Sequence, residues 1–169
     1  MPDYEKHLRG LREKYVEQTP WQRSGAGWQR LTFPNSEPNL LVTVVSVVEG
    51  LARSLVLQQR DLAQPKGAAR PTKRQIYAKV RNTGPTSLLE EVAASLGKPP
   101  DEVFGLEPWK ECAWAVKYRN FVVHECAYLG LTHSKALIRA SMKILRKLQT
   151  IGYDRGMREY GRPTNPRLR

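Results

Sequence analysis

The chain is poor in cysteine, in long apolar runs and in acidic residues, and each shortage excludes a class of protein. Its 169 residues include only two cysteines, Cys112 and Cys126, which are too few for a disulfide scaffold or a four-thiolate zinc site. The longest apolar run, residues 40–48, is far shorter than the roughly 20 residues of a membrane span. Charged residues fill the first positions, where a secretory signal would have an apolar segment. We therefore expect a cytoplasmic protein without a membrane partner.

Basic residues, by contrast, are abundant. The chain has 28 Lys and Arg against 16 Asp and Glu, a net charge of +12 and a pI near 10.0. Residues 60–82 carry a net charge of +6 and residues 135–169 one of +8, whereas residues 83–109 between them carry −4. This excess favours a polyanionic partner, nucleic acid first of all.

The pattern of apolar residues is helical almost throughout. It predicts helices over 3–17, 39–62, 72–82, 87–96, 108–128 and 132–151. Asn39 is the expected N-cap of the second helix, Gly97 stops the fourth and Gly152 ends the last. We predict an all-α bundle of about five to six helices. The N-terminal helix and an aromatic and proline-rich loop occupy 1–38, the bundle 39–152 and a basic tail 153–169.

The long helix over 108–128 places polar side chains on an otherwise apolar line. That line consists of Trp109, Ala113, Val116, Val123 and Ala127. Asn120 falls on it and His124 lies about 40° away around the helix, whereas Arg119 flanks it. Because buried polar groups need partners, we expect this end of the line to face a cleft or a second copy of the chain.

The segment Arg119-Asn120-Phe121-Val122-Val123-His124 resembles the signature of HEPN domains, an Arg followed by a polar residue and then, after a short gap, a His. The resemblance covers this motif and the helix pattern from about 39 to 151. It implies a two-fold homodimer that acts as a metal-independent endoribonuclease, often a toxin or antiviral effector, with no cofactor. It implies RNA as the substrate and an antitoxin or sensor protein as a further partner. Some toxin members have a Tyr two places after the His, where this chain has Cys126 and only later Tyr128.

These residue types suit metal-free RNA cleavage. An imidazole, whose ordinary pKa is about 6.5, can take the proton of a 2′-hydroxyl and return one to a leaving oxygen, which is the role expected of His124. A guanidinium matches the charge that grows on the phosphoryl oxygens, which is the role expected of Arg119. Asn120 would orient His124 or a phosphate oxygen without adding charge.

Two further groups of residues support this hypothesis. Glu49 and Arg53, four residues apart, form either an ordinary helix-surface ion pair or a pair near the bundle seam in which Glu49 steers Arg119 or His124. Cations on one face of the last helix, together with others in the 66–81 segment, could track an RNA backbone. We assign RNA binding to Arg139, Lys143, Arg146, Lys147, Lys73 and Arg74. Tyr77 and Tyr118 either stack on unpaired bases or are buried.

Other interpretations remain open. The chain could be a non-catalytic HEPN-like module that binds RNA or protein. Residues 88–107 also match the spacing of a helix-turn-helix, although the would-be reading helix over 100–107 is acidic and would be repelled by phosphate. Trp21, Trp28 and Phe33 either plug the N-terminal segment onto the bundle or form a partner surface. No metal is predicted, because Cys112, His124, Cys126 and His133 fit no recognised spacing.

Overall fold

The structure, a computed structural model, describes residues 3–22, 33, 36–64, 71–125 and 131–155. The described residues form helices and contain no strand, which confirms the all-α prediction. The elements are α1 (Tyr4–Glu17), α3 (Glu37–Leu62), α4 (Lys73–Val80), α5 (Pro85–Ala94), α6 (Pro100–Phe104), α7 (Leu106–Glu125) and α8 (Leu131–Asp154). All the predicted helices are present. The short α6 is an addition to them, so the expected number of helices was too low.

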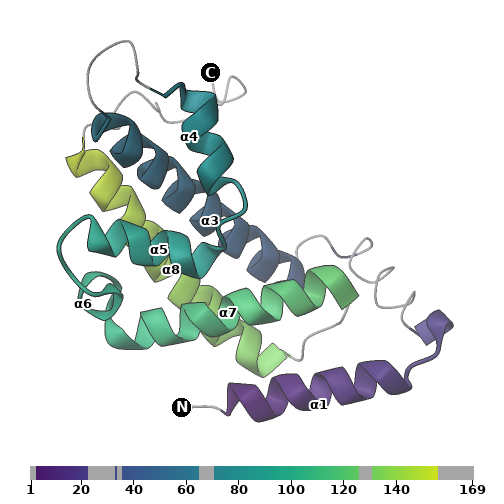
Figure 1. The fold of residues 1–169 in the computed structure, drawn as a ribbon. Coiled ribbons are helices and arrows are strands. Elements are labelled where there is room, and N and C mark those ends of the chain that lie inside the picture. The colour runs from purple at the N-terminus through teal and green to yellow at the C-terminus, as the bar shows by residue number, and fades with distance from the viewer. Residues whose placement is uncertain (1–2, 23–32, 34–35, 65–70, 126–130, 156–169) are drawn as a thin grey trace, which may run out of the picture.

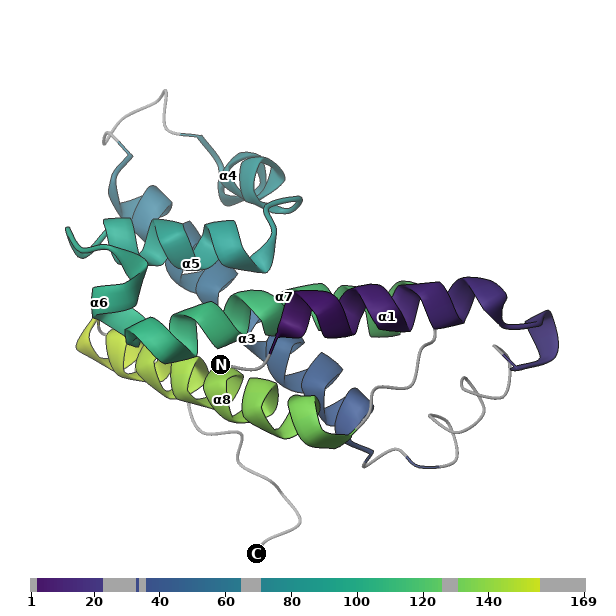
Figure 2. The ribbon, with the colours of Figure 1, turned by 90° about the horizontal axis from the view of Figure 1, so that it is seen from below.

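The long helices α3 and α8 pack side by side and form the centre of the molecule (Figure 1). α5 and α7 cover this pair on one side. The main packing partner of α4 among the described helices is α3. α1 lies along α7 (Figure 2), on the side away from α4 (Figure 1). The N-terminal helix is therefore attached to the same helix that carries the Arg119–His124 motif.

α3 begins at Glu37, two residues before the predicted cap at Asn39. Ser36 has extended backbone and is the N-cap, and a proline stands in the first turn at Pro38, where its missing N–H costs nothing. Asn39 lies inside the helix, and its side-chain amide donates to the carbonyl oxygen of Phe33 at 3.3 Å. The prediction of an Asn39 cap was wrong because the proline sets the start of the helix.

Two glycines with positive φ shape the turns around α6. Gly97 has φ +69° and follows the end of α5, as predicted. Gly105 has φ +87° and forms the corner between α6 and α7, where an added Cβ would lie 3.4 Å from Pro108 Cδ. Gly152, in contrast, does not end the last helix: it is buried inside α8, which continues to Asp154.

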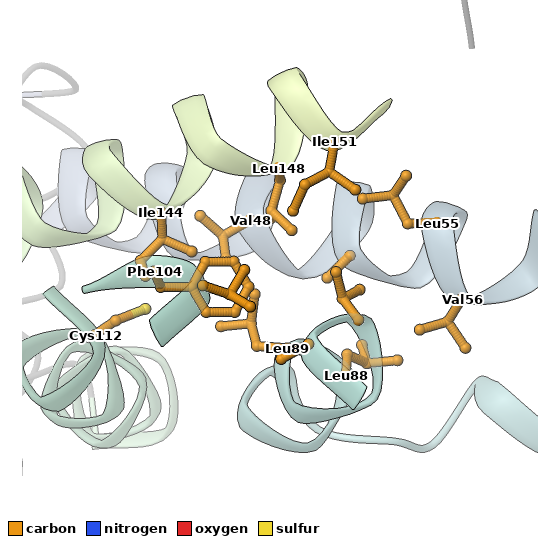
Figure 3. Packing of buried hydrophobic residues seen from close by; sticks show 14 of the residues in the cluster. Val48, Leu55, Val56, Leu88, Leu89, Phe104, Cys112, Ile144, Leu148 and Ile151 are labelled. Atoms are coloured by element: carbon orange, nitrogen blue, oxygen red, sulfur yellow. The ribbon is translucent and has the colours of Figure 1, made fainter. Parts of the chain in front are cut away.

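The core consists of two apolar clusters that share α3, α7 and α8. One gathers side chains of α3, α5, α6 and α8 around Val48, Phe104 and Leu148, as Figure 3 shows, with Cys112 at its edge. The other joins α1 to α7 and to the first halves of α3 and α8 through Tyr4, Leu8 and Tyr118. The predicted stripe of α3 is buried as expected: Leu41, Val44, Val45, Val48, Ala52 and Leu55.

α3 is long and apolar enough to cross a membrane by length and composition alone. In this structure it is the helix against which α8, α5, α7 and α4 pack. A central bundle helix and a membrane span have the same composition, because both are surrounded by apolar groups.

Candidate functional site

The buried face of α7 differs from the predicted one. Cys112, Ala115, Tyr118 and Val122 form its buried line, whereas Val123 is 39% exposed. Asn120 and His124 are therefore on the outer side of the helix and not on its core line. The prediction was wrong because α7 is only weakly amphipathic, so that spacing alone did not show which side α1 covers.

Because this side of α7 is the buried one, Arg119 lies at the seam between α7 and α3, where its side chain is 25% exposed. Its Nη2 lies 3.7 Å from Glu49 Oε2 of α3, and its Nη1 donates to Asn120 Oδ1 at 3.0 Å. Arg53 Nη2 donates to the other oxygen of the same carboxylate, Glu49 Oε1, at 2.5 Å, and to the carbonyl oxygen of Thr83 at 3.2 Å. Glu49 thus joins two guanidinium groups from two helices. We call Glu49, Arg53, Arg119 and Asn120 the Glu49 network.

The Glu49 network has more positive charge and more donors than its carboxylate can satisfy. Two guanidinium groups face one carboxylate, which leaves a net charge of +1. The Nε atoms of Arg53 and Arg119 are both buried without a hydrogen-bond partner. An unpaired buried donor costs free energy, about 1–3 kcal/mol in typical cases. The network is therefore better suited to an additional anion than to a cation.

His124 lies one turn beyond Asn120 on the same side of α7 and is exposed to solvent. Among the described residues, no hydrogen bond or ion pair connects it to Arg119, Asn120 or Glu49. None of the three described cavities includes Arg119, Asn120 or His124. The structure thus brings the predicted Arg, Asn, Glu and second Arg together, and leaves the imidazole beside them on an open face.

The predicted RNA-binding cations lie on two separate surfaces. Arg139, Lys143, Arg146 and Lys147 are all exposed along one side of α8, opposite the buried Leu137, Ala140, Ile144 and Leu148. Lys73 and Arg74 are exposed on α4. Because α4 and α8 lie at opposite sides of the molecule (Figure 2), the two groups do not form one continuous surface.

The structure bears on the expectations for the aromatic residues. Tyr118 is fully buried, so it is not available to stack on a base, whereas Tyr77 is 47% exposed. Trp21 and Phe33 are 85% and 62% exposed, so they do not plug the N-terminal segment onto the bundle. Trp28, Cys126 and Tyr128 lie outside the described residues.

The helix-turn-helix interpretation has little support in the geometry of α5 and α6. α6 has only five residues, too few to lie along a major groove and read several bases. Its acidic side chains, Asp101 and Glu102, are exposed, and Val103 and Phe104 are buried in the core. α6 is therefore a packing turn between α5 and α7.

A second polar cluster, between α1, α7 and α8, was not predicted. The imidazoles of His7 and His133 are stacked, with ring centroids 4.1 Å apart at 11°. His7 Nδ1 lies 2.7 Å from the hydroxyl of Tyr118, which donates to the carbonyl oxygen of Tyr4 at 3.2 Å. The spacing of Tyr4, Leu8, Leu11 and Tyr15 is a helical stripe that could have indicated the docking of α1.

Burial changes the pKa of several groups in this cluster. It lowers the pKa of His7, assisted by the charges of His133 and Lys14. It raises the pKa of Tyr4 to about 12, assisted by Glu111, to which the Tyr4 hydroxyl donates at 3.2 Å. Burial therefore favours the uncharged forms of His7 and Tyr4.

The described residues contain no group of three or more His, Cys, Asp or Glu that could hold a metal ion. Burial raises the pKa of the Cys112 thiol to about 11, so this thiol is a structural group and not a reactive one. A comparison of the chain with models of protein families, with curated proteins and with solved structures finds no match in any of the three.

Proposed function

We propose that this protein is a metal-independent endoribonuclease of HEPN type, in which Arg119, Asn120 and His124 act on RNA. The observation that carries the proposal is the Glu49 network. A carboxylate from α3 lies beside the Arg of an Arg-Asn-x3-His motif, at the seam of two helices. The Asn and the His of that motif face solvent, where a polymer can reach them.

The chemistry follows from the residue types. His124 takes the proton of a 2′-hydroxyl, and the oxygen attacks the adjacent phosphorus. The bond to the 5′-oxygen breaks, and that oxygen receives a proton from an imidazolium. The products are a 2′,3′-cyclic phosphate and a 5′-hydroxyl end. Arg119 stabilises the charge on the phosphoryl oxygens, and Asn120 holds the guanidinium through its Oδ1.

Each chain has one copy of the motif and therefore supplies one such imidazole, whereas this reaction uses a base and an acid. We propose that a second copy of the chain supplies the other. Val123 lies on the side of α7 that carries Arg119 and Asn120, and it is 39% exposed although it is apolar. Burial of this side chain in a two-fold dimer would bring both His124 residues to one cleft.

The first test is cleavage of RNA by the purified full chain in excess chelator. We expect cleavage that leaves 2′,3′-cyclic phosphate ends. His124→Ala should lower the rate by about 10²–10⁴-fold, and Arg119→Ala by about 10²–10³-fold. Arg12→Ala is the matched control, because Arg12 is an exposed arginine on α1. Cleavage that persists in both active-site variants would overturn the assignment.

The second test addresses the dimer. Val123→Glu should give a monomer by light scattering and should lose cleavage, because it places a charge in the proposed interface. Leu62→Glu is the control, since Leu62 is an apolar side chain that is 75% exposed at the end of α3. A Val123→Glu protein that keeps the mass and the activity of the unmodified protein would contradict the shared cleft.

A second function is favoured by the cations of α8, which would also suit a non-catalytic RNA-binding module. In that case the chain binds single-stranded RNA in a salt-dependent way without cleaving it. Binding without cleavage in the first test would favour this module over the enzyme.

A further inference from the structure

A cavity of about 430 Å³ lies between α1 and the start of α8, on the side of α7 away from the Glu49 network. Its lining residues are Asp3, Lys6, His7, Gly10, Leu11, Lys14 and His133. We call it the α1–α8 pocket. Its volume is within the range of small-molecule sites, about 300–1,000 Å³. Neither of the functions proposed above uses it.

Stacked aromatic rings form one part of the pocket wall. His7 stacks on His133 at 4.1 Å between ring centroids and on Tyr118 at 5.8 Å. The Tyr118 hydroxyl gives its proton to the Tyr4 carbonyl, so His7 Nδ1 is left as a donor to the hydroxyl oxygen. The imidazoles are thus fixed in orientation before any ligand arrives. A flat, rigid wall of this kind suits a planar ring system.

Gly10 of α1 lines the other side of the pocket, where the lack of a side chain leaves a gap. A Cβ built at Gly10 would meet no atom within 4 Å, so the backbone of α1 borders open space there. A glycine inside a helix costs about 1 kcal/mol relative to alanine, and no turn or positive φ requires one at this position. The gap admits a ligand close to the helix.

Two lysines stand on either side of this gap. Lys6 and Lys14 are four residues before and four after Gly10, so all three lie on one side of α1. Asp3 is the only carboxylate among the described lining residues, and it accepts the backbone N–H of Lys6 as the helix N-cap at 2.9 Å. The lysines therefore give the rim of the pocket a net positive charge, which suits a phosphate group.

We propose that the α1–α8 pocket binds one nucleotide unit. Its base lies against the imidazoles and Leu11, and its phosphate lies over Gly10, between Lys6 and Lys14. The choice of RNA as the source of that nucleotide rests on the proposed function. A free nucleoside monophosphate has the same chemistry. Base stacking on an aromatic platform and phosphate contact with lysine both tolerate any base sequence.

The test is calorimetric titration of the full-length protein with adenosine monophosphate, adenosine and inorganic phosphate. We expect the nucleotide to bind at least about tenfold more tightly than either of its parts. Gly10→Leu should abolish binding by filling the gap, although it improves helix propensity. Lys14→Gln should weaken binding about three- to tenfold. Arg12→Gln is the matched control, because it removes the same charge from α1 outside the pocket.

Competition identifies the source of the nucleotide. If RNA is the ligand, a single-stranded RNA of about 12 nucleotides displaces the bound monophosphate at a lower concentration than another free nucleoside monophosphate does. If the free nucleotide is the ligand, the RNA does not compete, and the RNA part of the inference is wrong. The proposed nucleotide site would be wrong if the protein did not bind the monophosphate, or if Arg12→Gln and Lys14→Gln lowered its affinity for the monophosphate equally.

Failure of this inference and failure of the proposed enzyme are separable. His124→Ala is expected to bind the monophosphate as the unmodified protein does, whether or not cleavage is found. Gly10→Leu with full cleavage but no nucleotide binding would place the pocket outside the reaction, as a binding site only.

Discussion

At the scale of single residues, Glu49 is the side chain on which the geometry of the candidate site depends. Its carboxylate is 18% exposed and contacts two guanidinium groups, and the described residues offer no second acid at that seam. Without it, Arg53 and Arg119 would face each other as like charges. Arg119 would then turn toward solvent and lose its fixed direction.

We therefore predict that Glu49→Gln lowers kcat for RNA cleavage by about tenfold to a hundredfold with little change in KM, because Glu49 positions Arg119 without touching substrate. It should also lower the free energy of unfolding by about 1–2 kcal/mol, the cost of leaving two partly buried cations unpaired. Urea unfolding and steady-state kinetics measure the two effects.

Glu37→Gln is the matched control on the same helix. Glu37 pairs with Lys135 at 3.6 Å, but the lysine is 65% exposed, so this pair should contribute less than about 1 kcal/mol. Equal effects of the two substitutions on kcat would show that Glu49 has only a structural role.

The sequence indicated which residues form the Glu49 network, but not on which side of α7 each of them lies. The spacing of Glu49 and Arg53 and the Arg-Asn-x3-His motif are local patterns, so they could be found without a structure. That Arg119 and not Asn120 lies at the seam depends on which side of α7 is covered by α1. This is a tertiary property, and periodicity does not predict it where a helix is only weakly amphipathic, as α7 is.

At the scale of elements, α1 is attached to the bundle by a small and unusual contact. Tyr4 and Leu8 supply its buried apolar surface, Leu11 and Tyr15 add partly buried contacts, and His7 stacks on His133. The facing charged groups are Asp3, Lys6 and Lys14 on α1 itself and, through the Tyr4 hydroxyl, Glu111 on α7.

This contact should weaken in acid. Because the pKa of His7 is lower in the folded chain than its ordinary value near 6.5, the unfolded or undocked chain takes up the proton first. Stability is therefore fully present above about pH 6.5 and falls as the pH drops below that value. We predict a lower thermal midpoint at pH 5.5 than at pH 7.5.

His7→Asn tests the cause of that difference, because asparagine can keep a hydrogen bond to Tyr118 but does not titrate. The part of the acid destabilisation that belongs to His7 should disappear in this variant. An unchanged difference between the two pH values would assign the effect to other groups.

The helices themselves were predicted well because each depends on local signals. Apolar periodicity located α3 and α8, and Gly97 marked the end of α5. The sequence did not predict the attachment of α1, because Tyr4 and His7 meet partners more than a hundred residues away in the chain. α6 was missed because five residues are too few to show a period.

At the scale of the whole molecule, positive charge is divided between two surfaces. The α8 surface carries Arg139, Lys143, Arg146 and Lys147, and the α4 surface carries Lys73 and Arg74. An RNA of about eight nucleotides that lies along one helix cannot also reach the helix on the opposite side (Figure 2). The two surfaces should therefore act independently on short RNA.

We predict that the double variant Arg139→Gln, Lys143→Gln lowers the slope of log K against log salt by about 1.4 for an eight-nucleotide RNA, since each lost phosphate contact on a single strand contributes about 0.7. The matched pair Lys73→Gln, Arg74→Gln should leave that slope unchanged and affect only longer RNA. Fluorescence anisotropy over a series of salt concentrations measures both slopes. Equal losses on the short RNA would contradict two independent surfaces.

The corner at Gly105 has a consequence for all of these sites. Its φ of +87° is a backbone conformation that residues with a Cβ rarely adopt, and an added Cβ would lie in contact with Pro108 Cδ, at 3.4 Å. α7 leaves this corner in one direction only, and from there it carries Trp109 into one core cluster, Tyr118 into the other and Arg119 to the seam. A side chain at Gly105 would change the direction in which α7 leaves this corner. Because the displacement of a rigid helix grows with distance from its start, His124, near the far end of α7, would move most.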